Sequence, residues 1–321
     1  MILLFHRREA IRFRPITHRF HRWMANGHRL RHFGQAPGGP QVVVDNLLRE
    51  LAIQNTMSWA QGYRDCPENP GIDAIWVVRG TQNLRWAIQN KHRMKAGQLW
   101  AGPNISVVPQ EAEKLLLSPE IDRVVVPSEW VSAFYAEQAP VLRAKLRIWP
   151  VGIDTDYWKP VAGDKKHLLI FNKGQEALSL EITRFLATQG VIFTTLRYGC
   201  YDPEEYRTAL SEAWGMVYLS ASESQGLAVL EALSMDVPVL AWDPGKCTYM
   251  SPELGQSFLC PATSIPYFDL RCGERFAALP EWSSKFVVFR EHLSGYHPRD
   301  YILNAHLDLA SNLESWKVFN G

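Results

Sequence analysis

The alternation of apolar and polar positions predicts a strand, a loop, a helix and a second strand between residues 215 and 242. Residues 216–219 form an apolar run with the length of a buried strand. Apolar positions then recur at helical spacing over 227–234, and residues 237–242 make a second apolar run. A unit of this kind implies a parallel sheet with a right-handed crossover.

The same pattern predicts further strands and helices along the rest of the chain. Strands are expected at 74–78, 98–101, 124–126, 146–149, 168–171 and 191–196, and helices at 41–51, 84–94 and 299–319. Gly152, between two prolines, fits a hinge in a linker. At 321 residues the chain suits two domains of about 150 residues each.

Composition narrows the class of protein. Hydrophobic residues make up 46% of the chain and charged residues 21%, as in globular proteins, and a net charge of +1 does not suggest a nucleic-acid partner. No apolar run approaches the roughly 18 residues of a membrane-spanning helix. The five cysteines are widely spaced, without a C-x-x-C pair, which favours a reducing compartment over a zinc site or a disulfide framework.

The first 33 residues differ from the rest of the chain. Eight arginines and one glutamate give them a net charge of +7. A nucleic-acid arm, a surface for anionic lipid and an organelle-targeting leader all match this composition. We favour an irregular extension, with the domain boundary near Met24. The alternative is that residues 1–5 supply a first strand.

Candidate chemistry concentrates in the loop at 221–226, which ends where the helix begins. A helix N-terminus offers unpaired N–H groups and a positive dipole end, which suit a diphosphate, and this loop lies at the carboxyl end of a strand. Glu223 lies in the loop and Glu231 eight residues later, where carboxylates are placed to accept hydrogen bonds from ribose or sugar hydroxyls. An amphipathic helix with a surface glutamate explains the same spacing.

Other polar and glycine positions are expected near this loop. Lys173 follows the strand at 168–171 and so points into the same crevice, where a cation would neutralise a departing diphosphate. A lysine after a strand is also a common surface residue. Glycines at 38, 39 and 199 allow close approach of the backbone to a ligand, although a flexible loop before a helix explains Gly38 and Gly39 equally well.

Four longer strings resemble one enzyme superfamily in the expected order. They are GGPQVVVDNLLREL (38–51), VVVPSEWVSAFY (124–135), WPVGIDTDYWKP (149–160) and ESQGLAVLEALSMDVPVLA (223–241). Together they are similar to retaining glycosyltransferases with the GT-B fold, of the E-x7-E type (family 4-like, glycosyl transferases group 1). The resemblance is greatest to a compact branch and covers residues 34 to 321.

The resemblance implies an α/β protein of two Rossmann-like domains, with parallel sheets facing a central cleft and a C-terminal helix crossing back to the first domain. The implied bounds are 1–33 for the basic extension, 34–155 for the acceptor-side domain, 156–298 for the nucleotide-sugar domain and 299–321 for the returning helix. The implied activity moves a sugar from a nucleotide-diphosphate-sugar to a hydroxyl of a glycan, lipid or other polysaccharide precursor, with retention.

The resemblance also implies roles for individual residues. Catalytic roles fall on Glu223 and Lys173, donor-binding roles on Ser224, Gln225, Gly226, Leu227, Glu231 and Gly199, and first-domain cleft roles on Gly38, Gly39 and Asn104. Two features depart from the larger family. No histidine follows the strand at 98–101, and Lys173 lacks the arginine that usually accompanies it.

No D-x-D pair or metal-ligand cluster is evident, so we expect no metal or other cofactor. The expected location is the cytoplasm, with at most peripheral association at the inner membrane surface. Two rival functions stay open. One is another GT-B enzyme, such as an epimerase or an inverting transferase. The other is a non-catalytic sugar-nucleotide-binding protein, which the two departures favour.

Overall fold

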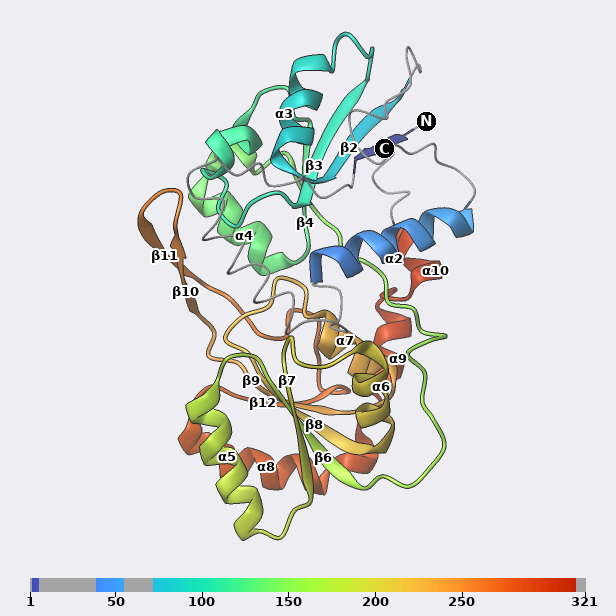
Figure 1. Cartoon of the computed structure of the whole chain (residues 1–321), viewed down its shortest axis with the longest axis vertical. Helices are drawn as coiled ribbons and strands as arrows, with labels where there is room; N and C mark the ends of the chain where they lie inside the picture. Colours follow the sequence, from blue (N-terminus) through green and yellow to red (C-terminus); the bar gives the residue numbers. More distant parts are fainter. Residues whose placement is uncertain (1, 6–38, 55–71, 316–321) are drawn as a thin grey trace, which may run out of the picture.

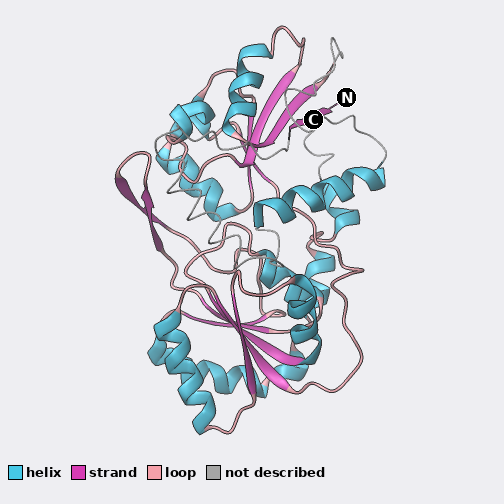
Figure 2. Ribbon diagram, in the orientation of Figure 1, coloured by secondary structure: helices cyan, strands magenta, loops and turns pink. Residues whose placement is uncertain are grey.

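The structure is a computed structural model that describes residues 2–5, 39–54 and 72–315. It has two α/β domains, one above the other in Figure 1, and each is built on a parallel five-stranded sheet. Helices lie on either side of the second sheet, which is seen nearly edge-on in Figure 2. The two predicted Rossmann-like domains are therefore present.

The first sheet has the strand order β1-β2-β3-β4-β5. Its strands are β1 (Ile2–Phe5), β2 (Ala74–Arg79), β3 (Gln98–Asn104), β4 (Arg123–Val126) and β5 (Leu146–Ile148). Its helices are α2 (Gly39–Gln54), α3 (Thr81–Asn90) and α4 (Glu129–Gln138), with short 3-10 turns η2 (Ala112–Leu117) and η3 (Pro140–Leu142). The strands β2 and β4 are near-continuous apolar runs because both faces of a parallel sheet are buried.

Residues 2–5 belong to this sheet, which corrects their assignment to a basic extension. Ile2 lies opposite Ala74 and Phe5 opposite Val77, in parallel register with β2. Leu4 and Phe5 are fully buried in the first-domain core. The arginines begin only after this strand, so the charge summed over 33 residues concealed a short apolar strand. The rest of the expected extension, 6–33, lies outside the described residues.

The second sheet has the order β12-β9-β8-β6-β7. Its strands are β6 (His167–Asn172), β7 (Phe193–Arg197), β8 (Ala213–Leu219), β9 (Val239–Trp242) and β12 (Gly273–Phe276). Its helices are α5 (Glu176–Thr188), α6 (Pro203–Glu212), α7 (Leu227–Ser234) and α8 (Trp282–Glu291), with 3-10 turns η4 (Leu279–Glu281) and η5 (Leu293–Gly295). The chain runs outward from β6 to β7 and then returns to β8 on the other side of β6. This reversal is the kind of point at which open α/β sheets bind ligands.

A hairpin leaves the second domain after β9 and packs against the first. Its strands, β10 (Cys247–Ser251) and β11 (Gln256–Cys260), are antiparallel and rise beside the first domain in Figure 1. The Tyr249 hydroxyl and the Ser251 Oγ donate to the Glu111 carboxylate at 2.8 and 2.6 Å. Phe258 is buried in the first-domain core. The hairpin therefore joins the two domains outside the linker.

The linker passes through a tight site at Gly152. Its N–H donates to Oε1 of Glu50 at 2.7 Å, and its carbonyl accepts from Asn46 Nδ2 at 2.9 Å. A Cβ at position 152 would lie 2.4 Å from that Glu50 oxygen and 3.0 Å from the Asp308 carbonyl oxygen, so any residue other than glycine would require its neighbours to shift. Burial raises the pKa of Glu50 well above its usual range. The expected hinge is thus held by α2 of the first domain.

The chain returns to the first domain at its C-terminal end, as expected, but through two helices. They are α9 (Pro298–Asn304) and α10 (Leu309–Ser315), separated at His306, whose φ of 54° ends the first helix. Asn312 in α10 accepts from Trp149 Nε1 at 2.8 Å and donates to the Pro150 carbonyl at 2.9 Å. Figure 1 shows α10 beside α2.

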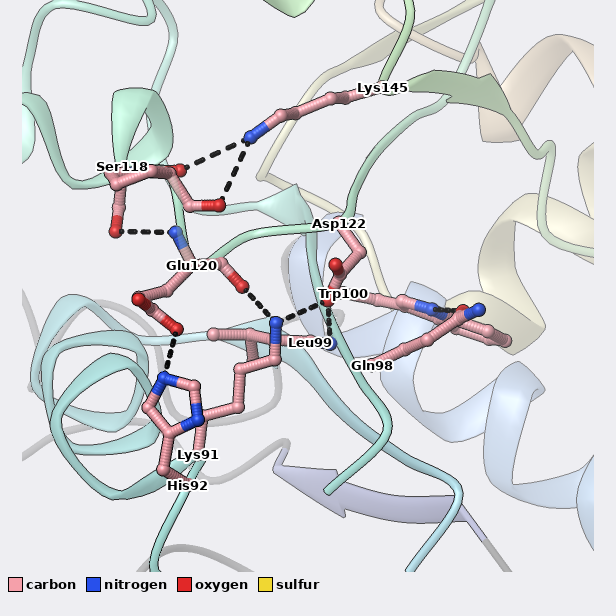
Figure 3. A network of polar contacts seen from close by, with 10 residues as sticks. Lys91, His92, Gln98, Leu99, Trp100, Ser118, Glu120, Asp122 and Lys145 are labelled. Atoms are coloured by element: carbon pink, nitrogen blue, oxygen red, sulfur yellow. Dashed lines mark hydrogen bonds and ion pairs between the residues drawn. The ribbon is translucent and has the colours of Figure 1, made fainter. Parts of the chain in front are cut away.

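A polar network closes the first domain at the amino ends of β3 and β4 (Figure 3). Lys91 Nζ donates to Asp122 Oδ2 and to the Glu120 carbonyl, both at 2.7 Å. The same Asp122 oxygen accepts from the Leu99 N–H at 2.7 Å. This network lies at the amino ends of the strands, opposite the end of the sheet that borders the cleft. It therefore supports the strands without contributing to the cleft.

Candidate active site

A cavity of about 1190 Å³ lies between the two domains. The first domain contributes the start of α2, the end of β3 and one side of α4, and the second contributes the loops after β6, β7 and β8. The carboxyl ends of parallel strands all lie at the same end of a sheet. In both domains the polar loops that follow the strands therefore border the same space. Most of the residues predicted for the site border this cavity.

The Glu223 carboxylate is held by three neighbours in the loop region after β8. Its Oε1 accepts from the Tyr218 hydroxyl at 2.7 Å and from Ser220 Oγ at 2.8 Å. Lys173 Nζ donates to Oε1 at 2.7 Å and to Oε2 at 2.9 Å. Burial, followed by the Glu223 charge, raises the pKa of Tyr218 far above its usual range, so this hydroxyl keeps its proton and donates.

Lys173 lies directly after β6, on the strand next to the one that leads to Glu223. Its backbone N–H donates to the Leu219 carbonyl at 2.8 Å, which fixes the start of the loop. Its ammonium group lies 4.5 Å from the centroid of the Tyr198 ring, a cation–π distance. The two residues expected to be catalytic are thus together at the switch point and paired with each other.

Glu231 faces the cavity from the middle of α7, about one turn after the loop ends. Its carboxylate has no hydrogen-bond partner within residues 2–5, 39–54 and 72–315. Burial beside the rings of Tyr201 and Tyr206 raises the pKa of Glu231 to about 8. A half-buried carboxyl group that is still reachable from a cavity is suited to receive hydroxyl donors from a ligand.

The loop between Glu223 and α7 combines ligand-facing and structural positions. Gly226 has a φ of 80°, in the left-handed region, directly before the first residue of α7. Ser224 and Leu227 border the cavity. The Gln225 side chain is buried, and its amide both accepts from the Val151 N–H at 3.1 Å and donates to the Val151 carbonyl at 2.8 Å. Gln225 therefore anchors the linker, and its amide is already occupied.

The remaining predicted residues lie on the far walls. Gly39 begins α2 and borders the cavity, whereas Gly38 is outside the described residues. Asn104 ends β3, and its buried Nδ2 has no hydrogen-bond partner in the part of the chain that the structure describes. Gly199, with a φ of 77°, follows β7 and also borders the cavity. These three positions therefore come from three different segments of the chain: the start of α2, the end of β3 and the loop after β7.

Several residues of the site were not predicted. Tyr218 lies in the apolar run that predicts a buried strand, and nothing in that run indicates that its hydroxyl reaches Glu223. Trp130 donates its Nε1–H to the Glu223 carbonyl at 2.8 Å and so links α4 to the loop at 221–226. Thr263 accepts from the Glu223 N–H at 2.9 Å. These contacts bring together segments that are distant in the sequence, so no local sequence pattern predicts them.

Two features of the described residues bear on cofactors and membranes. No group of three or more His, Cys, Asp or Glu side chains with a metal-binding arrangement occurs in 2–5, 39–54 and 72–315. Within the same ranges, every helix is too short or too polar to cross a membrane.

Comparison with known proteins identifies the fold. The sequence matches no protein-family model and no curated protein. Among solved structures it is similar to S. aureus TarM, bound to fondaparinux, α-GlcNAc-glycerol and UDP (TM-score 0.53, 12% identity, 77% of this chain and 55% of that chain). It is also similar to a glycosyltransferase from Rickettsia africae (TM-score 0.51, 11% identity, 88% of this chain and 81% of that chain). These neighbours are GT-B glycosyltransferases, so the predicted GT-B fold is confirmed. The chain spans just over half the length of TarM.

Proposed function

We propose that this chain is a retaining glycosyltransferase that uses a nucleotide-diphosphate-sugar donor. The observation that carries the proposal is one cavity in which the Lys173–Glu223 pair, the open carboxyl of Glu231 and the N-terminus of α7 meet. The glycosyltransferase neighbours support it, because one of them was solved with UDP and a glycoside bound.

The donor would span the switch point of the second sheet. The ribose hydroxyls donate to Glu231, and the diphosphate lies at the N-terminus of α7, where the helix dipole favours an anion. The phosphates compete with Glu223 for the Lys173 ammonium group. When the ammonium turns toward the phosphates, Tyr218 and Ser220 still hold Oε1 of Glu223, and Oε2 becomes free for a sugar hydroxyl.

Bond cleavage then concentrates negative charge on the leaving phosphate. A preorganised cation near that oxygen stabilises the transition state more than the bound donor, which is the requirement for catalysis. Lys173 and the N–H groups of α7 supply this charge in the proposed site, so the proposed reaction is independent of metal. The departing phosphate takes the proton of the acceptor hydroxyl, and the acceptor enters from the first-domain side, past Gly39 and Asn104.

The acceptor is proposed to be a hydroxyl of a glycan or lipid-linked precursor, in the cytoplasm or at the inner membrane surface. The test begins with a thermal-shift screen of UDP-, GDP- and ADP-sugars, since a bound ligand raises the melting temperature by mass action. The donor that stabilises the chain is then incubated with and without acceptors. We expect release of nucleoside diphosphate, and an α-linked product from an α-linked donor.

A second candidate function is a non-catalytic sugar-nucleotide-binding protein. The observation that favours it is the direct ion pair, because Glu223 already neutralises the one cation placed after β6. Stabilisation by a sugar nucleotide without hydrolysis or transfer would support this candidate and contradict the enzyme. An inverted product or an epimerised donor would instead support the other GT-B chemistries.

A further inference from the structure

Two cysteines face each other across the stem of the β10–β11 hairpin. Cys247 is the register partner of Cys260 in the antiparallel ladder. Opposed residues of such a ladder have Cα atoms about 4.5–5.5 Å apart, which falls within the roughly 4.4–6.8 Å that a disulfide requires. A bond between the sulfurs therefore needs little movement of the backbone.

The surroundings give the two thiols different roles. Cys260 is 2% exposed, whereas Cys247 is half-buried, and both border the interdomain cavity. Burial, followed by its neighbour Cys247, raises the pKa of Cys260 to about 11. A reagent that enters the cavity therefore reacts first with Cys247, and the buried Cys260 is the thiol that reacts second.

We propose that Cys247 and Cys260 form a redox-active pair that closes to a cross-strand disulfide by exchange with a small-molecule disulfide. In the first step the Cys247 thiolate attacks one sulfur of the reagent, which forms a mixed disulfide and releases one thiol. In the second step Cys260 loses its proton and attacks Cys247, which closes the protein disulfide and releases the second thiol. The protein loses two electrons and two protons, and the reagent gains them.

The location of the pair gives the disulfide a structural consequence. On one side of it, Thr263 Oγ1 donates to Asp243 at 2.9 Å, and the Thr263 carbonyl accepts from the Glu223 N–H. On the other side, Tyr249 donates to Glu111 of the first domain at 2.8 Å. A disulfide between Cys247 and Cys260 would cross-link the two strands of the hairpin between these contacts. The segment that holds the Glu223 loop would then be joined covalently to the strand that contacts the first domain. This inference does not depend on the proposed activity.

The sequence makes the pair easy to observe by peptide mapping. Cleavage after Lys246 and Arg271 places both cysteines in one tryptic peptide, 247–271, separate from the peptides of Cys200 and Cys272. The reduced full chain is incubated with oxidised glutathione, denatured, alkylated and digested with trypsin. The masses of the peptides are then measured by mass spectrometry. We expect peptide 247–271 to lose the mass of two hydrogens, to carry no alkyl group and no glutathione, and to regain both alkylation sites after reduction.

Two variants and a melting curve complete the test. Cys200→Ser, which changes an exposed thiol elsewhere, should oxidise as the wild type does. Cys247→Ser should leave peptide 247–271 alkylated at Cys260. Oxidation should raise the melting temperature of the wild type by several degrees and leave that of Cys247→Ser unchanged, because cross-linking restricts the unfolded chain. The proposal is overturned if glutathione remains attached to Cys247, if both thiols stay alkylatable, or if either one links to a different cysteine.

Discussion

Replacing Glu231 with glutamine removes a carboxyl group whose ionisation opposes folding. Burial raises its pKa from 4.5 to about 8 in the folded protein. The folded state thus keeps a proton that the unfolded chain releases above pH 4.5, and wild-type stability falls as the pH rises from there to about 8. Each pKa unit corresponds to about 1.4 kcal/mol, so the upper limit of this loss at pH 7 is roughly 3 kcal/mol.

The cavity reduces that limit, because water reaches one side of Glu231. We take about half of it, so Glu231→Gln should be more stable than the wild type by about 1.5 kcal/mol at pH 7 and by little at pH 4.5. The same change should weaken donor binding by roughly 1.5–3 kcal/mol, the contribution of a hydrogen bond to a charged group. In the wild type, donor affinity should rise as the pH rises through the raised pKa of Glu231, because the ribose hydroxyls require the carboxylate.

Urea unfolding at intervals from pH 4.5 to pH 8.5 measures the stability, and calorimetric titration with the nucleotide measures the affinity. Glu291→Gln makes the same chemical change on an exposed helix position and should reproduce the wild-type curve. Parallel pH profiles for the wild type and Glu231→Gln would refute the burial argument. Unchanged nucleotide affinity in the folded variant would refute the role in ribose binding.

Three further predictions concern other parts of the structure. Lys173→Ala should lower kcat about a hundredfold at saturating donor, with a smaller change in donor affinity and partial recovery in Lys173→Arg; a near-normal kcat would make Lys173 a surface residue. Gly152→Ala should lower the free energy of unfolding by about 1–3 kcal/mol, because its Cβ would overlap Glu50, and equal urea midpoints would contradict this. A chain beginning at Met24 should lose roughly 3–6 kcal/mol through the absence of Leu4 and Phe5 from the core, whereas an unchanged melting temperature would show that β1 is dispensable.

The sheets and the central unit were predictable because their signals are local. The strands that become β2, β4, β6 and β8 are compact apolar runs, as strands buried on both faces must be. Glycines and polar residues mark the loops that follow them. The E-x7-E spacing then placed Glu223 and Glu231 in one cavity, and the strand-end rule added Lys173.

The elements that were missed depend on partners far away in the sequence. The hairpin strands are only weakly apolar, so their sequence gives little sign of a strand. They are held by contacts with the first domain, such as that of Tyr249 with Glu111, which lies 138 residues earlier in the chain. The facing of Cys247 and Cys260 was not predictable for the same reason, since only the register of the hairpin brings the two free thiols opposite each other. Gln225 matched a donor-binding motif, but its amide pairs with Val151 of the linker.

The pairing of Trp149 with Asn312 has a consequence for biosynthesis. The two residues are 163 positions apart, and the indole N–H of Trp149 is buried against a residue that is synthesised long after it. Domains usually fold in order as the chain leaves the ribosome. Here the first domain emerges with the Trp149 site uncovered, and it stays so until residue 312 has been synthesised and α10 has docked. Ribosome-bound nascent chains that stop before α10 should therefore be more sensitive to proteases in the first domain than the released protein.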